Sequence, residues 1–370
     1  MPRLTAREEE ILKILHNEPM ISQEELANRL ELTRSAAAVH ISNLIKKGFI
    51  LGRGYVFNQQ KKVVVIGGAN YDIKGIVVSD KVEMLTSNVG KIVTSVGGVG
   101  RNIAENLARL NVPTSLLSAV GRDKHGRAII EYSKEAGVDM SQILQTGKHN
   151  SGTYMAFLND KNDLQVGLAD MNIIDVIDTQ YIESNLSLLK NAGIIVCDTN
   201  LRKDTIEYIA HQANELNCTL VVEPVSVEKA RKVKDILSYI DIITPNKEEL
   251  EEICQMQLNS FEDYKRAGDM LLSQGVRIVL LKLGEKGLFL YSDDSAEMIP
   301  SMADEIVDVT GGGDSLVGGF LAAYYKGIPL QQCAKIASIC AALTLQCKDT
   351  VSPKLSWEKL KKELKEDLTK

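Results

Sequence analysis

The chain has 370 residues, a net charge of −6 at pH 7 and 44% hydrophobic residues. This composition is ordinary for a globular protein with a sizeable core, and it excludes a disordered chain, a collagen-like repeat and a disulfide-stabilised miniprotein. No apolar run reaches the roughly 18–20 residues of a membrane span, and the acidic N-terminus lacks a signal-peptide core. The six cysteines show no Cys-x-x-Cys spacing, so we expect a cytoplasmic protein with reduced cysteines and no membrane partner.

Residues 1–58 are expected to form a winged helix-turn-helix domain. Three segments with helical periodicity follow one another, and each begins at a residue type that caps helices: Thr5, Ser22 and Thr33. Gly48 ends the third segment, and residues 49–57 are expected to form a small hairpin. Two helices, a tight turn, a third helix and a β wing are the elements of this domain.

The third helix of such a domain contacts the major groove of DNA. Here that helix offers four candidate DNA-binding side chains: Arg34, His40, Asn43 and Lys46. Residues 1–58 hold eight basic and seven acidic side chains, and a net charge of +1 neutralises few phosphates. DNA is therefore a candidate partner, and the alternative is a domain used for packing or dimer contacts.

From residue 62 onward, short apolar runs alternate with helical patterns. The predicted strands span residues 63–66, 114–120, 193–197, 219–222, 240–244 and 278–283. Near-continuous apolar strands separated by helices are typical of an α/β fold, in which helices cover both faces of a doubly wound, mainly parallel sheet. Ligands bind such sheets beyond the carboxyl ends of the strands, so the residues after each strand are the candidates for a site.

Two glycine-containing turns offer polar side chains at this edge. Asn70 and Asp72 follow the first strand and suit sugar hydroxyls, although Gly, Asn and Asp are also ordinary turn residues. Gly97 and Gly98 precede a helix that begins near Asn102. This is not the first βα turn, which disfavours a dinucleotide-binding fingerprint. A turn that directs Asn102 into a cleft is equally consistent with the pattern.

The segment 308–320 is the most specific in the chain. Three glycines, Gly311, Gly312 and Gly313, come directly before Asp314 and an apolar helix. Helix N-termini present unpaired N–H groups, so the glycine backbone can form an anion hole for a transferring phosphoryl group. Asp314 is placed to accept the proton of an attacking hydroxyl. The alternative is a glycine-rich turn in which Asp314 only caps the helix.

The segments 97–102 and 308–320 resemble the two signatures of the ribokinase-like family, the phosphofructokinase-B type of sugar and nucleoside kinases. The resemblance covers about residues 62–362. It implies a doubly wound core with a small β-sheet lid, whose strands come from about residues 73–96 and 151–168. It also implies ATP and Mg²⁺ as cofactors and a homodimer that pairs through the lid sheets.

One position departs from the first signature of that family. Asn111 stands where a glycine usually follows the helix. Asparagine also adopts the left-handed backbone region, so we expect the turn to be kept.

The resemblance implies further site residues. Asn246 and Glu249 match an Asn-x-x-Glu motif that organises Mg²⁺ and phosphate through water, although the pair could also be a plain helix cap. The segment with Lys282, Gly284 and Gly287 resembles a turn that contacts the nucleotide. A K⁺ site is implied for three residues: Asp308, Thr310 and Ser352. The Lys348 ammonium could occupy this site instead.

Within the family, the fused winged helix and the segments 97–108, 151–156 and 223–227 resemble the pseudouridine kinase branch, which phosphorylates the ribose 5′-hydroxyl of a C-nucleoside. The substrate would then meet Asn70, Asp72, Gly97, Gly98, Asn102 and Thr153. The alternatives are another nucleoside or sugar kinase and a nucleoside-responsive DNA-binding regulator. A kinase for sugar phosphates would need clustered Lys or Arg, and the sequence offers only Lys74 near Asp72 and Arg101 near Asn102.

Overall fold

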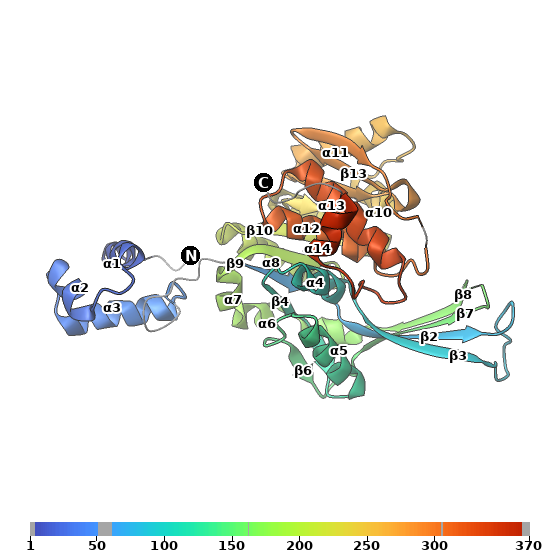
Figure 1. The fold of residues 1–370 in the computed structure, drawn as a ribbon, viewed down its shortest axis with the longest axis horizontal. Helices are drawn as coiled ribbons and strands as arrows, with labels where there is room; N and C mark the ends of the chain where they lie inside the picture. Colours follow the sequence, from blue (N-terminus) through green and yellow to red (C-terminus); the bar gives the residue numbers. More distant parts are fainter. Residues whose placement is uncertain (1–3, 51–60, 162, 305, 365–370) are drawn as a thin grey trace.

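The computed structural model describes residues 4–50, 61–161, 163–304 and 306–364 (Figure 1). The N-terminal helices are α1 (Ala6–Asn17), α2 (Gln23–Arg29) and α3 (Arg34–Lys46). Thr5 caps α1 as expected: its hydroxyl accepts from the Glu8 amide at 3.2 Å, and the Glu8 carboxylate accepts from the Thr5 amide at 2.7 Å. Most of the predicted hairpin at 49–57 lies outside the described residues.

The main sheet of the larger part has the strand order β14-β13-β12-β11-β10-β9-β1-β4. Strands β13 and β14 are antiparallel to their neighbours and close one edge, and the other strands are parallel. The strand bounds are β1 (Lys62–Ile66), β4 (Thr114–Leu117), β9 (Ala192–Asp198), β10 (Thr219–Glu223), β11 (Ile242–Ile243), β12 (Ile278–Lys282), β13 (Leu288–Ser292) and β14 (Ser295–Ile299).

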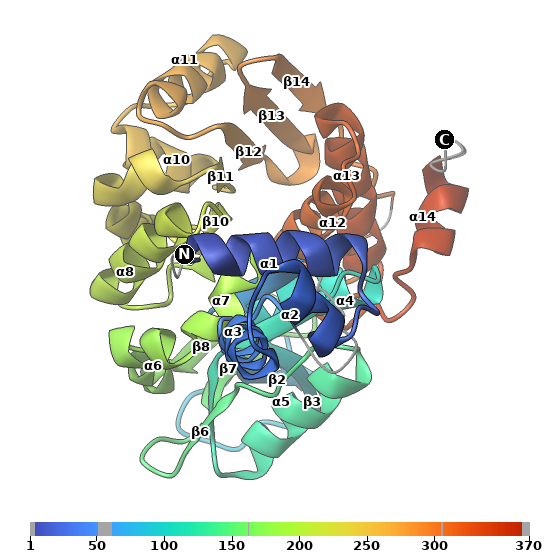
Figure 2. The ribbon, with the colours of Figure 1, turned by 90° about the vertical axis from the view of Figure 1, so that its left-hand side faces the viewer.

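Helices cover both faces of this sheet (Figure 2). One face carries α4 (Val99–Arg109), α12 (Gly312–Tyr325), α13 (Leu330–Leu345) and α14 (Trp357–Leu364). The other carries α6 (Thr179–Ser184), α7 (Leu186–Lys190), α8 (Lys203–Glu215), α9 (Val227–Ala230), α10 (Lys247–Cys254) and α11 (Phe261–Ser273). Strand β1 shows why the strands are apolar throughout. Val63 and Val65 pack into the core under α4, α12, α13 and α14. Val64 and Ile66 pack into the core on the opposite face, since successive side chains of a strand point to opposite faces.

A second, narrower sheet projects from this body (Figure 1) and is the expected lid. Its order is β3-β2-β7-β8, with β2 (Asn70–Val77), β3 (Gly90–Gly97), β7 (Gly152–Leu158) and β8 (Leu164–Asp170). Helix α5 (Lys124–Glu135) packs against β2, where the rings of His125 and Tyr71 stack 4.5 Å apart.

Two strand predictions need correction, and one turn prediction is confirmed. The single strand predicted at 114–120 is broken at Ser118, and its second half, β5 (Ala119–Gly121), pairs with β6 (Leu144–Thr146) in a separate sheet. The strand predicted at 240–244 is regular only over Ile242–Ile243. Asn111 has a φ of 55°, which confirms the left-handed turn. Among the described residues, we find no helix that is both long and apolar enough to cross a membrane.

Candidate active site

The carboxyl ends of the parallel strands bring most of the predicted site residues to one edge of the main sheet, where such sheets bind ligands. Asn246 follows β11, and Lys282 ends β12. Two buried carboxylates join them there, Asp198 at the end of β9 and Glu223 at the end of β10. Helix α12, which carries the three-glycine segment, starts beside them.

Gly311 shapes the start of α12. It is the N-cap, with a φ of 80°, and a side chain at this position would overlap the Thr350 carbonyl. The first helical hydrogen bond runs from the Ser315 amide to the Gly311 carbonyl at 2.9 Å. The amides of Gly312, Gly313 and Asp314 therefore have no carbonyl partner within the helix, which is the arrangement of an anion hole.

Asp314 is the third residue of α12, and the alternative in which it caps the helix is ruled out because Gly311 holds that position. The Asn102 side-chain amide, on α4, donates to Asp314 Oδ2 at 2.7 Å. Loss of hydration raises the pKa of Asp314 to about 7, against the lowering effect of the Asn102 hydrogen bond. A carboxylate with a pKa near neutrality has the proton affinity of a general base.

The Lys282 ammonium lies beside the anion hole. Its Nζ donates to Glu223 Oε1 at 2.6 Å, and a Cβ added to Gly313 would lie 3.7 Å from the Lys282 side chain. The resemblance implies that Lys282 belongs to a nucleotide-contacting turn, and in the structure its ammonium lies close to Gly313 at the start of α12. Gly284 and Gly287 form the following turn at the same edge, both with positive φ.

Asn246 and Glu249 cap α10 reciprocally. The Asn246 side-chain oxygen accepts from the Glu249 amide at 2.8 Å, and the Glu249 carboxylate accepts from the Asn246 amide at 2.8 Å. Burial raises the pKa of Glu249, and the nearby Lys282 counteracts the rise. The capping alternative is therefore present in the structure. The donor set of Glu249, Asn246 and Glu223 consists of oxygens, the ligands that fit a hard cation such as Mg²⁺.

The lid brings Asn70, Asp72 and Gly97 together. Asn70 and Asp72 lie on the same face of β2, and the Asn70 amide donates to the Asp72 carboxylate. A side chain on Gly97 would overlap that carboxylate, and Gly98, with a φ of 101°, packs on the Gly68 carbonyl. Burial raises the pKa of Asp72 to about 6, with Lys74 as the main opposing influence.

Thr153 is predicted to bind substrate together with Asp72, but the structure does not bring it to this face of the lid. In the β2–β7 register Thr153 pairs with Tyr71, and Tyr154 pairs with Asp72. Since neighbouring paired residues share a face, Thr153 lies on the opposite face from Asp72. Its hydroxyl donates to the Ser151 carbonyl at 3.1 Å.

The residues assigned to a K⁺ site are only partly brought together. Lys74, on the same face of β2 as Asp72, donates to Asp308 Oδ2 at 2.5 Å and to Thr310 Oγ1 at 3.2 Å. Ser352 is buried, and its amide donates to Thr344 Oγ1 at 3.3 Å. The sequence predicts Lys348 as the lysine that could occupy the K⁺ site. In the structure, Lys74 is the lysine that binds Asp308.

Sequence reasoning missed Asp198 as a site residue. This carboxylate is 1% exposed and accepts from the amides of Gly68 at 2.8 Å, Gly100 at 3.0 Å and Asn200 at 2.9 Å. It thereby ties both glycine turns of the substrate side to the sheet. The signal was available, because Asp198 directly follows the apolar strand predicted at 193–197, at the edge where ligands bind.

On α3, the four predicted DNA-binding residues differ in exposure. Arg34 and Lys46 are exposed, and His40 and Asn43 are half-buried. The next lysine, Lys47, pairs with Glu8 of α1 at 2.7 Å and lowers the pKa of that carboxyl to about 2. We therefore expect Arg34 and Lys46 to be the cations of α3 most accessible to a phosphate backbone.

Two protein-family models match the chain. One, described as the pfkB family carbohydrate kinase, matches residues 60–357, and the other, a winged helix-turn-helix DNA-binding domain, matches residues 4–50. The uncharacterized sugar kinase YeiI of Escherichia coli strain K12 is 32% identical over 351 residues, which cover 95% of this chain and 96% of that protein. The pseudouridine kinase of the same strain is 33% identical over 296 residues, or 80% of this chain and 93% of that protein.

Solved structures agree with this match. A carbohydrate kinase from Agrobacterium tumefaciens has a TM-score of 0.73 at 25% identity, over 83% of this chain and 97% of that chain. Ribokinase of Arabidopsis thaliana, solved with ribose and ATP, has a TM-score of 0.74 at 24% identity over 84% and 100%, a likeness of fold. The fold thus defines a ribokinase-like kinase, an enzyme class that transfers a phosphoryl group to an alcohol. More particularly, the chain belongs to the pfkB carbohydrate kinase family and carries a winged helix-turn-helix domain ahead of the kinase.

Proposed function

We propose that this protein is an ATP-dependent nucleoside kinase that phosphorylates the ribose 5′-hydroxyl of pseudouridine. The observation that carries the kinase chemistry is Asp314 at the anion hole of α12, bonded to Asn102. The 33% identity to a pseudouridine kinase favours this nucleoside. The match to the uncharacterized sugar kinase YeiI covers 95% of this chain, and it keeps other sugars and nucleosides as alternative substrates.

In the proposed reaction, the 5′-hydroxyl oxygen attacks the γ-phosphorus of ATP, and the Asp314 carboxylate accepts the proton of that hydroxyl. The bond to the β,γ-bridging oxygen breaks, and ADP leaves with that electron pair. The amides of Gly312 and Gly313 and the Lys282 ammonium stabilise the negative charge of the transferring group. Asp72 and Asn102 hold the ribose hydroxyls through hydrogen bonds.

ATP and Mg²⁺ would enter from the side of Asn246, Gly284 and Gly287. Glu249 would hold Mg²⁺ through water, with Glu223 as a second buried carboxylate. The ion would neutralise phosphate charge and orient the γ-phosphoryl group. The residues of this chain supply the base, the anion hole and the positioning.

A panel of nucleosides and sugars with ATP and Mg²⁺, read by ADP release, tests the proposal. Pseudouridine should give the highest kcat/KM, above uridine, ribose and fructose 6-phosphate. A higher value for ribose or a sugar phosphate would replace the proposed substrate. Lys74 is the cation on the lid face nearest Asp72, and a preference for a sugar phosphate would point to it.

We propose K⁺ as an activator with Lys74 as its competitor. Asp308 and Thr310 offer K⁺ a carboxylate and a hydroxyl, but the Lys74 ammonium holds both oxygens. Activity measured in K⁺, Na⁺ and tetramethylammonium at fixed ionic strength tests this. The K⁺ concentration for half-maximal activity should be lower in Lys74→Met than in the wild-type protein. Equal rates in all three cations for both proteins would reject the K⁺ site.

DNA binding is a second candidate function, favoured by the match of residues 4–50 to a winged helix-turn-helix DNA-binding model. Arg34 and Lys46 are exposed on α3, the helix that enters the major groove in such domains. With a net charge of +1 on residues 1–58, a single domain should bind weakly, and two half-sites held by a dimer would strengthen binding.

We also propose a homodimer that forms through the outer face of the lid sheet. Exposed apolar side chains gather on that face, opposite Asp72: Ile92, Phe157, Val166 and Leu168. Clustered apolar exposure of this kind marks an interaction surface more often than scattered single residues do. A second copy of the lid would cover it.

A further inference from the structure

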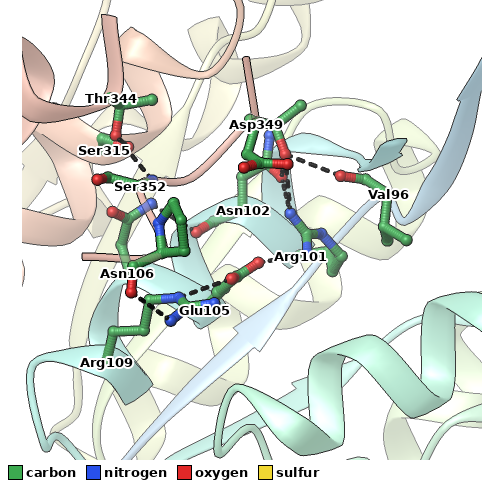
Figure 3. Close-up of polar contacts among 12 residues, drawn as sticks. Val96, Arg101, Asn102, Glu105, Asn106, Arg109, Ser315, Thr344, Asp349 and Ser352 are labelled. Atoms are coloured by element: carbon green, nitrogen blue, oxygen red, sulfur yellow. Dashed lines mark hydrogen bonds and ion pairs between the residues drawn. The ribbon is translucent and has the colours of Figure 1, made fainter. Parts of the chain in front are cut away.

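Arg101, the residue before Asn102, is a buried arginine that the proposed mechanism does not use (Figure 3). Arg101 is on α4, and its side chain is 1% exposed. A buried guanidinium carries a charge out of water, so its partners must compensate for the lost hydration. These partners lead directly to the proposed base.

The guanidinium contacts three side chains. One terminal nitrogen, Nη1, donates to Glu105 Oε2 at 2.5 Å. The other, Nη2, donates to Thr350 Oγ1 at 3.1 Å and also to Asn102 Oδ1. The Thr350 hydroxyl has one proton to donate, and its oxygen lies 2.8 Å from the Val96 carbonyl oxygen and 3.1 Å from Asn102 Oδ1. Arg101 thus connects α4 with Thr350 in the loop after α13, and through Thr350 with the end of the lid strand β3.

The contact with Asn102 fixes which end of its amide faces Asp314. A side-chain amide has a donating nitrogen and an accepting oxygen, and the two ends can exchange by rotation. Arginine has only donors, so it accepts no bond from the nitrogen end and holds the oxygen end. The nitrogen is then directed at Asp314 Oδ2, 2.7 Å away. A rotated amide would place its oxygen against the carboxylate and its NH₂ against the guanidinium.

We propose that Arg101 is a positioning residue, which holds the Asn102 amide in the orientation that donates to Asp314. The inference rests on the proposed role of Asp314 as the base. It adds a residue that touches neither substrate nor the reacting atoms. Arg101 acts through Asn102 on the hydrogen bonding, and hence the proton affinity, of the base.

The charge of Arg101 is compensated within the same network. Glu105 is fully buried and accepts from Arg101 on one oxygen and from Arg109 Nε on the other, at 2.7 Å. Arg109 therefore shares the same carboxylate partner and the same charge as Arg101. Among the contacts of the described residues, however, its further bond runs to the Pro353 carbonyl, at 3.2 Å, and not to Asn102. This makes Arg109 a matched control.

Other charged groups also act on Asp314 and must stay in place during the test. Glu223 and Asp198, at the ends of β10 and β9, favour its protonated form, and Lys282, at the end of β12, favours its ionised form. Substitutions at Arg101 and Arg109 leave these three side chains unchanged.

The test is a direct titration of Asp314 by ¹³C NMR in protein labelled with [4-¹³C]aspartate, with the signal assigned by its loss in Asp314→Asn. In Arg101→Met the Asp314 titration should move upward by about one pH unit, the scale of one lost hydrogen bond to a charged group. In Arg109→Met it should stay at the wild-type position. An unchanged titration in a folded Arg101→Met protein would overturn the proposal.

Two further variants keep the test decisive. If Arg101→Met does not fold because Glu105 loses one of its two arginine partners, the double variant Arg101→Met/Glu105→Met removes both buried charges and should show the same upward shift. In an Asn102→Leu background, Arg101→Met should produce little further shift, since the amide through which it acts is gone. A full shift in that background would show that Arg101 acts by its charge alone, which contradicts the positioning role.

The titration requires no turnover, so it is separate from the test of function. A protein that phosphorylates no member of the substrate panel would reject the proposed function even if Asp314 titrates as expected. A normal kinase with an unshifted Asp314 in Arg101→Met would instead reject the positioning role. The two failures are therefore distinguishable.

Discussion

The raised proton affinity of Asp314 predicts that the activity of the protein rises with pH and that its stability falls. Its pKa of about 7 means that the ionised form, which can accept a proton, accumulates as the pH rises through neutrality. We expect kcat/KM to rise between pH 6 and pH 8 with an apparent pKa near 7. At pH 8, where Asp314 is mostly ionised, Asp314→Asn should lower kcat by about 100-fold or more, and the difference should shrink below pH 7. Near-normal kcat in that variant at pH 8 would reject the base assignment.

The same shift predicts a gain in stability for Asp314→Asn. A carboxyl with a raised pKa binds its proton more tightly in the folded state, so the stability it contributes is lost as the pH rises from about 4 to about 7. The asparagine variant has no such loss. Its Tm should therefore exceed that of the wild-type protein at pH 8 by more than at pH 4, as measured by calorimetry.

Asp72 and Thr153 form a matched pair on opposite faces of the lid. If Asp72 holds a ribose hydroxyl, Asp72→Ala should weaken substrate binding by about 1–3 kcal/mol, the cost of one lost partner in a buried site. Thr153→Val should have little effect, and the KM for ATP should change much less in either variant. Steady-state KM values for both substrates test this. Equal losses for nucleoside and ATP in Asp72→Ala would count against a sugar-specific role.

Sequence patterns predicted residues whose role follows from the backbone, and failed where a role depends on strand register. The glycines before Asp314 implied a helix start with free amides, and the structure begins α12 there. Thr153 was misplaced because one residue of register exchanges the two faces of a strand. The Lys74–Asp308 contact joins residues far apart in the chain, and no local pattern encodes it.

The apolar parallel strands were predictable from the sequence, and the positions of their ends were less so. Strands β9, β10 and β12 lie within a residue of the predicted bounds. The run at 114–120 carries one continuous β pattern, but Ser118 breaks it so that β5 can pair with β6. Pairing partners of this kind are set by tertiary contacts, which periodicity does not record.

The outer face of the lid makes a prediction about assembly. Ile92 is 73% exposed on β3, and a lysine there would bring charge into the proposed lid–lid interface. Ile92→Lys should convert a dimer into a monomer in sedimentation velocity at micromolar concentration. Met20→Lys changes an apolar side chain outside the lid that is 87% exposed, and this control variant should stay dimeric. A wild-type protein that is monomeric throughout would reject the lid-mediated dimer.

DNA binding by the winged helix and substrate binding by the kinase would be coupled if substrate alters the spacing of the two DNA-binding domains in a dimer. Such a coupling is typically about 1–3 kcal/mol and must act in both directions. Fluorescence anisotropy with DNA from the protein's own upstream region, with and without nucleoside, measures it. Arg34→Ala and Lys46→Ala should weaken binding. Affinity equal to that for random DNA at about 0.1 M salt, unchanged by either substitution, would leave the domain without a DNA-binding role.

We propose that the protein transfers a phosphoryl group to the 5′-hydroxyl of pseudouridine, with Asp314 as the base. Its most direct test is ³¹P–¹H correlation NMR of the product formed from pseudouridine, ATP and Mg²⁺. We expect a product whose phosphorus is coupled to the two H5′ protons of the ribose. The wild-type protein should form this product, and Asp314→Asn should form it at least about 100-fold more slowly. Absence of phosphorylated pseudouridine with a wild-type protein that turns over another alcohol, or coupling to a different ribose proton, would contradict it.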